Sequence, residues 1–229
     1  MKPPTPPRAR PLAGTFATVS TLRVERSPKR VRAYRDGAVV VDSPRPRLVW
    51  ERVYPTYYFP AADVRTELVP PGALRVADEP ELAGLVRVAW NAMDEWLEED
   101  EPVYVHARDP YTRVDILASS RHVVVEVGGT VVASSRQPRV LFETGLPARF
   151  YLPLVDVRVD LLRPSRTTTM CPYKGTATYW HVVVDGVLHE DLVWCYRSPL
   201  PESQKITGLA CFYSERAALT VDGVASTED

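Results

Sequence analysis

The sequence contains few cysteines and histidines, and neither residue type forms a metal-binding pattern. Cys171, Cys195 and Cys211 are the three cysteines, no Cys-x-x-Cys pair occurs, and only four histidines are present in 229 residues. Structural zinc sites need closely spaced Cys and His ligands. We therefore expect no metal ion and no other cofactor. Because free cysteines are usually buried, we expect Cys195 and Cys211 to be reduced structural side chains.

Long hydrophobic runs are also absent, although hydrophobic residues make up 45% of the chain. No stretch approaches the roughly 18 apolar residues that a membrane helix needs. Residues 1–7 include four prolines and no apolar segment of the kind found in a secretory signal. These features predict a cytoplasmic protein that does not cross a membrane.

Acidic residues are scarce at the N-terminus. Residues 1–32 carry eight basic side chains against one acidic side chain, and five of the first eleven residues are proline. A basic arm can attract nucleic acid, but closely spaced prolines oppose compact pairing. The rest of the chain has no recognisable basic groove or stacking platform. We therefore predict a solvated basic tail and do not expect nucleic acid as a partner.

Two segments of the chain have similar sequences. Residues 35–65 align with residues 127–158 at an offset of 92 residues, which becomes 93 after one insertion. Glycine, proline, charged and aromatic positions match together, and Glu51 is aligned with Glu143. Self-similarity at this period indicates a duplicated domain. The predicted organisation is a tail over residues 1–30, a first copy over 31–101, a connector over 102–120 and a second copy over 121–225.

Both copies have the composition of antiparallel sheets. Residues 123–133 are mostly β-branched on either side of Gly128-Gly129, a pattern typical of a β-hairpin. Residues 182–188 repeat this pattern around an Asp-Gly turn. The predicted fold class is therefore mainly β, with two small antiparallel β domains in tandem.

One segment departs from the β pattern. Apolar residues between positions 80 and 99 follow the i, i+3, i+4, i+7 spacing of an amphipathic helix, and Asp78 can cap its start. We predict one helix near residues 80–99. Trp90, Met93 and Trp96 are expected on its buried face.

The second copy contains a segment that has no counterpart in the first copy. Residues 171–175 read Cys-Pro-Tyr-Lys-Gly and precede a strand rich in Thr, Tyr and Trp, which predicts a turn that presents Lys174 over an aromatic surface. This lysine can provide a point charge for an anion or an amine nucleophile. It can also be a buried cation paired with an acid such as Glu202 or Glu215. The sequence leaves these alternatives open.

Two neighbours of Lys174 are candidates for assisting a reaction. A cation close to Cys171 would favour its reactive thiolate, although a buried, inert cysteine is an equal alternative. In an enzyme, Lys174 would be the nucleophile or the general acid, helped by Cys171, Tyr173 or Glu202. The candidate catalytic residues are Lys174, Cys171 and Glu202.

Aromatic residues in the second copy predict a pocket beside this turn. Small-molecule sites are lined by rings with a few polar groups, although such rings can also form only a core. The polar connector between the copies offers further candidates, because pockets often form between domains. The predicted ligand-binding residues are Tyr173, Tyr179, Trp180, Trp194, Tyr213, His106 and Arg113.

Several short motifs carry a resemblance to a known family. They lie at residues 94–101 (Asp-x-Trp-x-Glu-Glu-Asp-Glu), 106–115 (His-x-Arg-Asp-Pro-Tyr-x-Arg-Val-Asp), 141–147 (Leu-Phe-Glu-Thr-Gly-Leu-Pro), 171–175 and 212–216 (Phe-Tyr-x-Glu-Arg). With these motifs the chain resembles the bacterial "domain of unknown function 427" proteins in a tandem two-copy form. The resemblance implies a compact β domain of the tent or cage type. That family is sometimes labelled as nucleotidyltransferases, but this sequence lacks the Gly-Ser pair with spaced aspartates that two-metal transfer would need.

The sequence does not identify a reaction. We expect a small-molecule-binding β protein in which Lys174 anchors an anionic or carbonyl group beside the aromatic rings of the second copy. The first copy is truncated and lacks the Cys-Pro-Tyr-Lys-Gly segment, so we expect it to be a packing partner. The alternative is an enzyme that uses Lys174 as nucleophile or general acid. The oligomeric state is not predicted.

Overall fold

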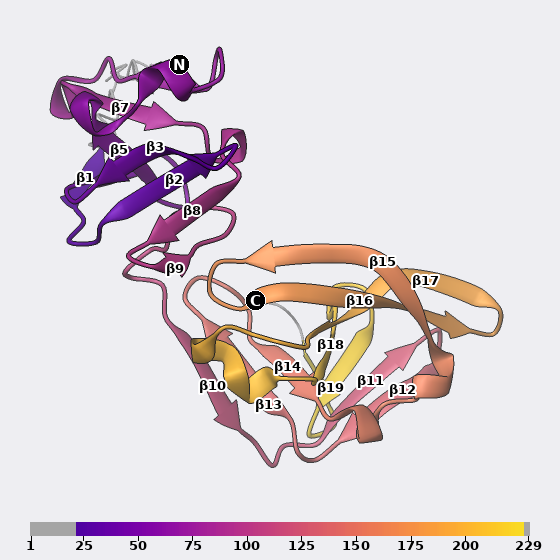
Figure 1. The fold of residues 1–229 in the computed structure, drawn as a ribbon. Helices are drawn as coiled ribbons and strands as arrows, with labels where there is room; N and C mark the ends of the chain where they lie inside the picture. The colour runs from indigo at the N-terminus through magenta and orange to yellow at the C-terminus, as the bar shows by residue number, and fades with distance from the viewer. Residues whose placement is uncertain (1–21, 227–229) are drawn as a thin grey trace, which may run out of the picture.

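A computed structural model describes residues 22–226, and Figure 1 shows these residues as two groups of strands joined by one connection. In the N-terminal half, the order of the first sheet is β1 (Arg23–Arg26), β4 (Arg47–Trp50), β5 (Thr56–Pro60), β7 (Leu85–Val88) and β6 (Leu74–Val76). The second sheet has the order β3 (Ala38–Ser43), β2 (Val31–Arg35), β8 (Glu95–Glu98) and β9 (Glu101–Pro102). All of the pairings are antiparallel.

The C-terminal half also has two antiparallel sheets. The larger sheet has the order β10 (Val114–Ala118), β13 (Arg139–Glu143), β14 (Arg149–Leu152), β18 (Ala210–Phe212), β17 (Val187–Tyr196), β16 (Gly175–Val184) and β15 (Leu162–Cys171). The smaller sheet has the order β12 (Thr130–Ser135), β11 (Val123–Val127), β19 (Ala218–Val221) and β20 (Val224–Ala225). The mainly β fold class is therefore confirmed.

Short 3-10 helices connect the strands. They are η1 (Ala61–Asp63), η2 (Thr66–Leu68), η3 (Pro80–Leu82), η4 (Trp90–Ala92), η5 (Leu154–Asp156), η6 (Val159–Leu161) and η7 (Pro201–Ile206). No α-helix occurs among residues 22–226, and no helix in that range is long and apolar enough to span a membrane.

Equivalent local structures recur in the two halves. Arg47 pairs with Tyr58 in the register in which Arg139 pairs with Tyr151. The β2–β3 and β11–β12 hairpins have matching register shifts, after Ala33 and Val125. Their turns each contain two consecutive residues with positive φ, as type I′ hairpin turns do. The duplication expected from the sequence stays a prediction, and these matching registers are the observations that agree with it.

The larger C-terminal sheet has a core on each face. Because successive side chains of a strand point to opposite faces, neighbouring residues belong to different cores. Phe150 and Leu152 pack in the core that also contains side chains of the smaller sheet. Tyr151, between them, joins a second cluster that is rich in aromatic residues. The second face therefore positions the rings of the candidate site.

The predicted helix near residues 80–99 is wrong. The segment contains η3, β7, η4 and β8, with Gly84 at a φ of +77° before β7. Val86 pairs with Phe59 and Trp96 with Ala33, so distant strands override the local helical spacing. The expectation of burial is confirmed for Met93 and Trp96, while Trp90 is partly buried and stacks on Trp96 at 4.6 Å.

The predicted tail extends too far along the chain. Residues 1–21 lie outside the described residues, whereas β1 pairs with β4 in an antiparallel sheet. Lys29 also forms an ion pair of 2.6 Å with the buried Glu98. Residues 23–30 are therefore part of the folded N-terminal half.

Asp109 connects the two halves. Its carboxylate accepts a hydrogen bond of 2.9 Å from the indole of Trp50, and its backbone N–H donates to the hydroxyl of Tyr173 at 2.8 Å. Trp50 belongs to β4 and Tyr173 to the turn between β15 and β16. The connection therefore contacts both the first sheet and the turn that carries Lys174.

Replacing Trp96 tests its assignment to a buried strand. We expect Trp96→Ala to lower the free energy of unfolding by roughly 3–5 kcal/mol, because a large buried side chain would leave a cavity. The measurement is denaturant unfolding of the N-terminal half. Val53→Ala is the control, since Val53 is 79% exposed and should change stability by no more than about 0.5 kcal/mol. Equal effects of the two substitutions would contradict the assignment.

Candidate functional site

The turn that carries Lys174 is fixed by its contacts with residues 198–203. Gly175 has a φ of +89°, and an added Cβ would lie 3.5 Å from the backbone atoms Leu200 N and Ser198 O. Leu200 donates its N–H to the carbonyl of Lys174 at 3.2 Å. The hydroxyl of Ser203 donates to the carbonyl of Tyr173 at 3.1 Å. Glycine is needed here because its backbone adopts positive φ without strain.

Lys174 forms an ion pair with Glu143, the last residue of β13. Their side chains are only 11% and 9% exposed. Neither acid considered from the sequence takes this role. Glu202 lies exposed on η7, and Glu215 pairs with Arg149. Lysine has three donors, and one of them is used on Glu143, so the ammonium can still donate to a ligand.

A cavity of about 190 Å³ lies beside this ion pair, and we call it the ring pocket. Its charged lining residues are Glu143, Arg149 and Lys174. Its rings are Tyr151, Tyr179, Trp194, Tyr196 and Tyr213, and its aliphatic lining residues are Leu141, Leu146 and Pro147. For scale, an engineered apolar cavity of about 150 Å³ binds benzene, so the volume fits one small ring.

Hydrogen bonds and ring contacts hold the aromatic wall in place. The indole of Trp194 donates to the hydroxyl of Tyr151 at 3.1 Å and packs 4.5 Å from the ring of Tyr213. The hydroxyl of Tyr179 lies 2.8 Å from that of Thr169 and 3.5 Å from that of Tyr213. These contacts preorganise the wall, and the hydroxyl groups of Tyr179 and Tyr213 lie next to each other.

Burial raises the pKa values of three phenols of this wall. Desolvation raises the pKa of Tyr213 to about 12, and its hydrogen bond with Tyr179 adds to the shift. Burial also raises the pKa values of Tyr151 and Tyr196. Tyrosine is already neutral at neutral pH, and these shifts extend the range in which the three side chains offer hydroxyl groups to more alkaline pH.

Arg149 provides the second cation of the ring pocket. Its guanidinium is bound by Glu215 and by the hydroxyl of Ser214, which lies 2.8 Å from Nη1. It also lies 5.8 Å from the ring centroid of Trp194. Arg149 therefore holds the rim of the pocket against the aromatic wall.

Four of the residues predicted from the sequence meet in the ring pocket: Lys174, Tyr179, Trp194 and Tyr213. The other six do not line it. Trp180 packs against the opposite core, Tyr173 binds Asp109 and Arg113 pairs with Asp115 at 78% exposure. His106 stacks on Tyr54, Glu202 is exposed and Cys171 is half-buried outside the lining.

Sequence reasoning missed Glu143, Arg149 and Tyr151 as members of the site. Glu143 belongs to one of the family motifs and is aligned with Glu51, so an acid at the same position in both segments was an available signal. No comparable signal marked Arg149. Tyr151 lies in the repeated segment 127–158, and nothing in the sequence marked it as part of the site.

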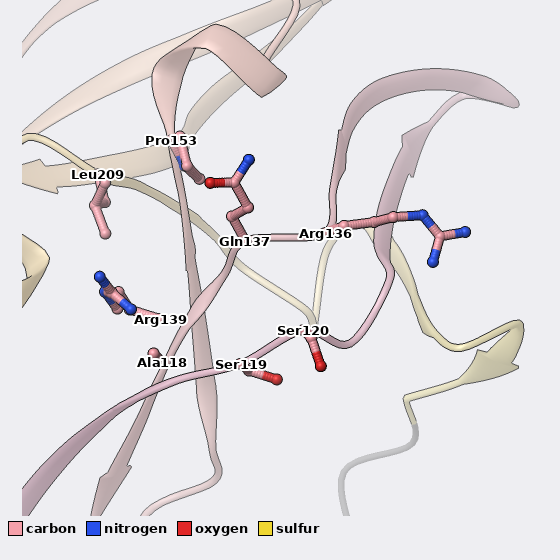
Figure 2. A pocket seen from close by; sticks show the side chains of 8 residues that line it. All are labelled: Ala118, Ser119, Ser120, Arg136, Gln137, Arg139, Pro153 and Leu209. Carbon is pink, nitrogen blue, oxygen red and sulfur yellow. The ribbon is translucent and has the colours of Figure 1, made fainter.

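A second cavity in the C-terminal half has a different character. Figure 2 shows it between the strand ends near Ser119 and Gln137, with Leu209 and Pro153 on one side. In Figure 2 the guanidinium of Arg136 points away from Gln137 on one side, and the guanidinium of Arg139 lies on the other side of Gln137, near Leu209. Because the two cations do not converge, this cavity has no focused charge for a ligand.

Comparison with known families assigns the chain to one of them. The family described as "Domain of unknown function (DUF427)" matches residues 23–79 and 115–224. These segments cover most of the chain, and the protein belongs to this family. The second segment includes every residue of the ring pocket. No curated protein matches the sequence significantly.

A double-mutant cycle tests the buried ion pair. We expect Lys174→Met to lower the free energy of unfolding by about 3 kcal/mol, because it leaves the buried Glu143 without its cation. The double variant Lys174→Met/Glu143→Gln should recover most of that loss, since no unpaired charge remains. Denaturant unfolding provides the comparison. The cycle also needs the single variant Glu143→Gln. If the stability loss of the double variant equals the sum of the losses of the two single variants, the pair is not coupled.

The raised pKa of Tyr213 predicts a dependence of stability on alkaline pH. An unfolded tyrosine ionises near pH 10, whereas folded Tyr213 ionises near pH 12. Unfolding then releases a proton between these values, so the free energy of unfolding falls as pH rises through this window. In an ultraviolet absorbance titration, Tyr213→Phe should remove a phenol that ionises near pH 12. If Tyr213→Phe instead removes a phenol that ionises near pH 10, the raised pKa of Tyr213 is contradicted.

Proposed function

We propose that the chain is a small-molecule-binding protein whose ligand enters the ring pocket, with Lys174 as its polar anchor. The observation that carries this proposal is the position of a buried lysine beside five aromatic rings. Small-molecule sites combine such rings with a few fixed polar groups. The remaining donors of Lys174 suit a carbonyl or carboxylate oxygen.

The size of the ring pocket restricts the ligand. A volume of about 190 Å³ accommodates a single ring with a short polar substituent. Trp194 and Tyr213 provide flat faces for such a ring, and neutral phenols can donate to its substituent. We therefore propose a small aromatic or cyclic molecule that carries a carbonyl or carboxylate group.

The contacts favour binding over the alternative of an enzyme. Lys174 is held in an ion pair with Glu143, so its amine would have to leave that pair before it could attack a carbonyl. Cys171 and Glu202, the proposed helpers, do not line the ring pocket. Desolvation raises the pKa of Cys211, which keeps its thiol protonated and unreactive. No observation favours nucleotidyl transfer.

A fragment titration tests the anchor. Single-ring carboxylates and ketones are titrated into the wild-type chain and into Lys174→Met/Glu143→Gln, which removes the ammonium without leaving an unpaired charge. We expect fragments that raise the melting temperature of the wild type to lose at least about tenfold in affinity for this variant, which is about 1.4 kcal/mol.

Lys205→Met is the matched control, because Lys205 is exposed on η7 and does not line the ring pocket. It should bind the fragments as the wild type does. Equal binding to the wild type and the Lys174 variant would refute the anchor role of Lys174.

A further inference from the structure

The N-terminal half contains an acid at the position that Glu143 occupies in the C-terminal half. Glu51 directly follows β4, as Glu143 ends β13. Tyr58 has the register position of Tyr151, and its hydroxyl donates to Glu51 at 2.5 Å. Among residues 22–226, the N-terminal half has no counterpart of the turn that carries Lys174, so Glu51 obtains its cations from other elements.

Two arginines supply that charge. Arg75 on β6 donates to one oxygen of Glu51 at 2.9 Å, and Arg87 on β7 donates to the other at 2.6 Å. Arg75 also binds Glu79 at 2.8 Å. Glu51, 20% exposed, is therefore fully engaged by two guanidinium groups and one phenol.

These residues line a cavity of about 590 Å³, which we call the arginine cavity. Arg52, Arg75 and Arg87 outnumber its acids, Glu51 and Glu79, so the lining has excess positive charge. Within residues 22–226, Arg87 donates only through Nη1, and exposed Arg52 has no ion-pair partner. Their unused guanidinium donors suit an oxyanion, which arginine can bind through two parallel hydrogen bonds.

The other wall of the arginine cavity is a pair of stacked rings. Tyr54 and His106 lie 4.2 Å apart with an angle of 19° between their planes. His106 comes from the connection between the halves, and its Nδ1 lies 2.7 Å from the carbonyl of Ala107, which fixes the ring. The volume of the cavity is in the usual range for small-molecule sites, about 300–1,000 Å³.

We propose that the arginine cavity is a second binding site, specific for a small organic oxyanion with a carboxylate or phosphate group. Arg52 and Arg87 contact the anion, and the stacked pair of Tyr54 and His106 packs against its body. Glu51 does not repel the anion, because its charge is neutralised by Arg75 and Arg87. The arginine cavity and the ring pocket share no lining residue, so this site is independent of Lys174.

Titration of the full chain tests this site. Sodium benzoate and sodium phosphate are added separately to isotopically labelled protein at constant ionic strength, and backbone amide shifts are followed by NMR. We expect saturable shifts at residues 51–56 that persist in Lys174→Met/Glu143→Gln, whereas any benzoate shifts at residues 141–151, which line the ring pocket, are lost in that variant. Saturation with benzoate alone assigns a carboxylate ligand, and saturation with phosphate alone assigns a phosphate ligand.

Charge-removing variants make the outcome decisive. Arg52→Met should weaken binding at least tenfold without affecting the fold, because Arg52 is exposed and unpaired within residues 22–226. Arg87→Met should weaken it as well, whereas Arg121→Met, which removes an arginine paired with Asp222, should have no effect. Shifts that never saturate, or that saturate equally in Arg52→Met, overturn the proposal. Unchanged binding in the Lys174 variant separates this result from the ring pocket.

Discussion

The buried ion pair of Lys174 and Glu143 is the constraint on which the candidate site depends. A buried charge is strongly unfavourable without its partner, so β13 and the turn between β15 and β16 must meet. That meeting requires positive φ at Gly175 and the support of residues 198–203. The ion pair with Glu143 therefore places Lys174 at the edge of the aromatic wall and so helps to form the ring pocket.

Strand length explains why the two halves differ in the shape of their cavities. In the C-terminal half, β15, β16 and β17 each have ten residues. The N-terminal sheet has five strands and ends at β6, which has three residues, whereas the C-terminal sheet has seven strands. The long strands β15 to β17 extend the C-terminal sheet and add rings to its second face. Tyr179 and Trp194 come from these extensions, and they complete a wall that Tyr151 begins. The N-terminal half has no equivalent of β15 and β16, and its arginine cavity has a volume of about 590 Å³ and a more charged lining.

Local sequence patterns predicted the structural features that are determined by residues close together in the chain. The hairpin at Gly128-Gly129 and four residues of the ring pocket were accessible in this way, because turn chemistry and alternation act over a few residues. The helix near residues 80–99 was wrong because pairing with distant strands decides that segment. Glu143 was missed for the same reason: it lies 31 residues from Lys174, and no local pattern encodes that contact.

The same acid position has different chemical consequences in the two halves. In the C-terminal half, one lysine satisfies Glu143 and keeps donors beside a compact set of rings, which favours a small ring with a carbonyl or carboxylate group. In the N-terminal half, two arginines satisfy Glu51, and the cavity retains excess positive charge. Guanidinium groups bind planar oxyanions through paired donors, whereas an ammonium acts as a point charge. Under the proposed duplication, different cations around the shared acid position would give one chain two sites with different ligand preferences.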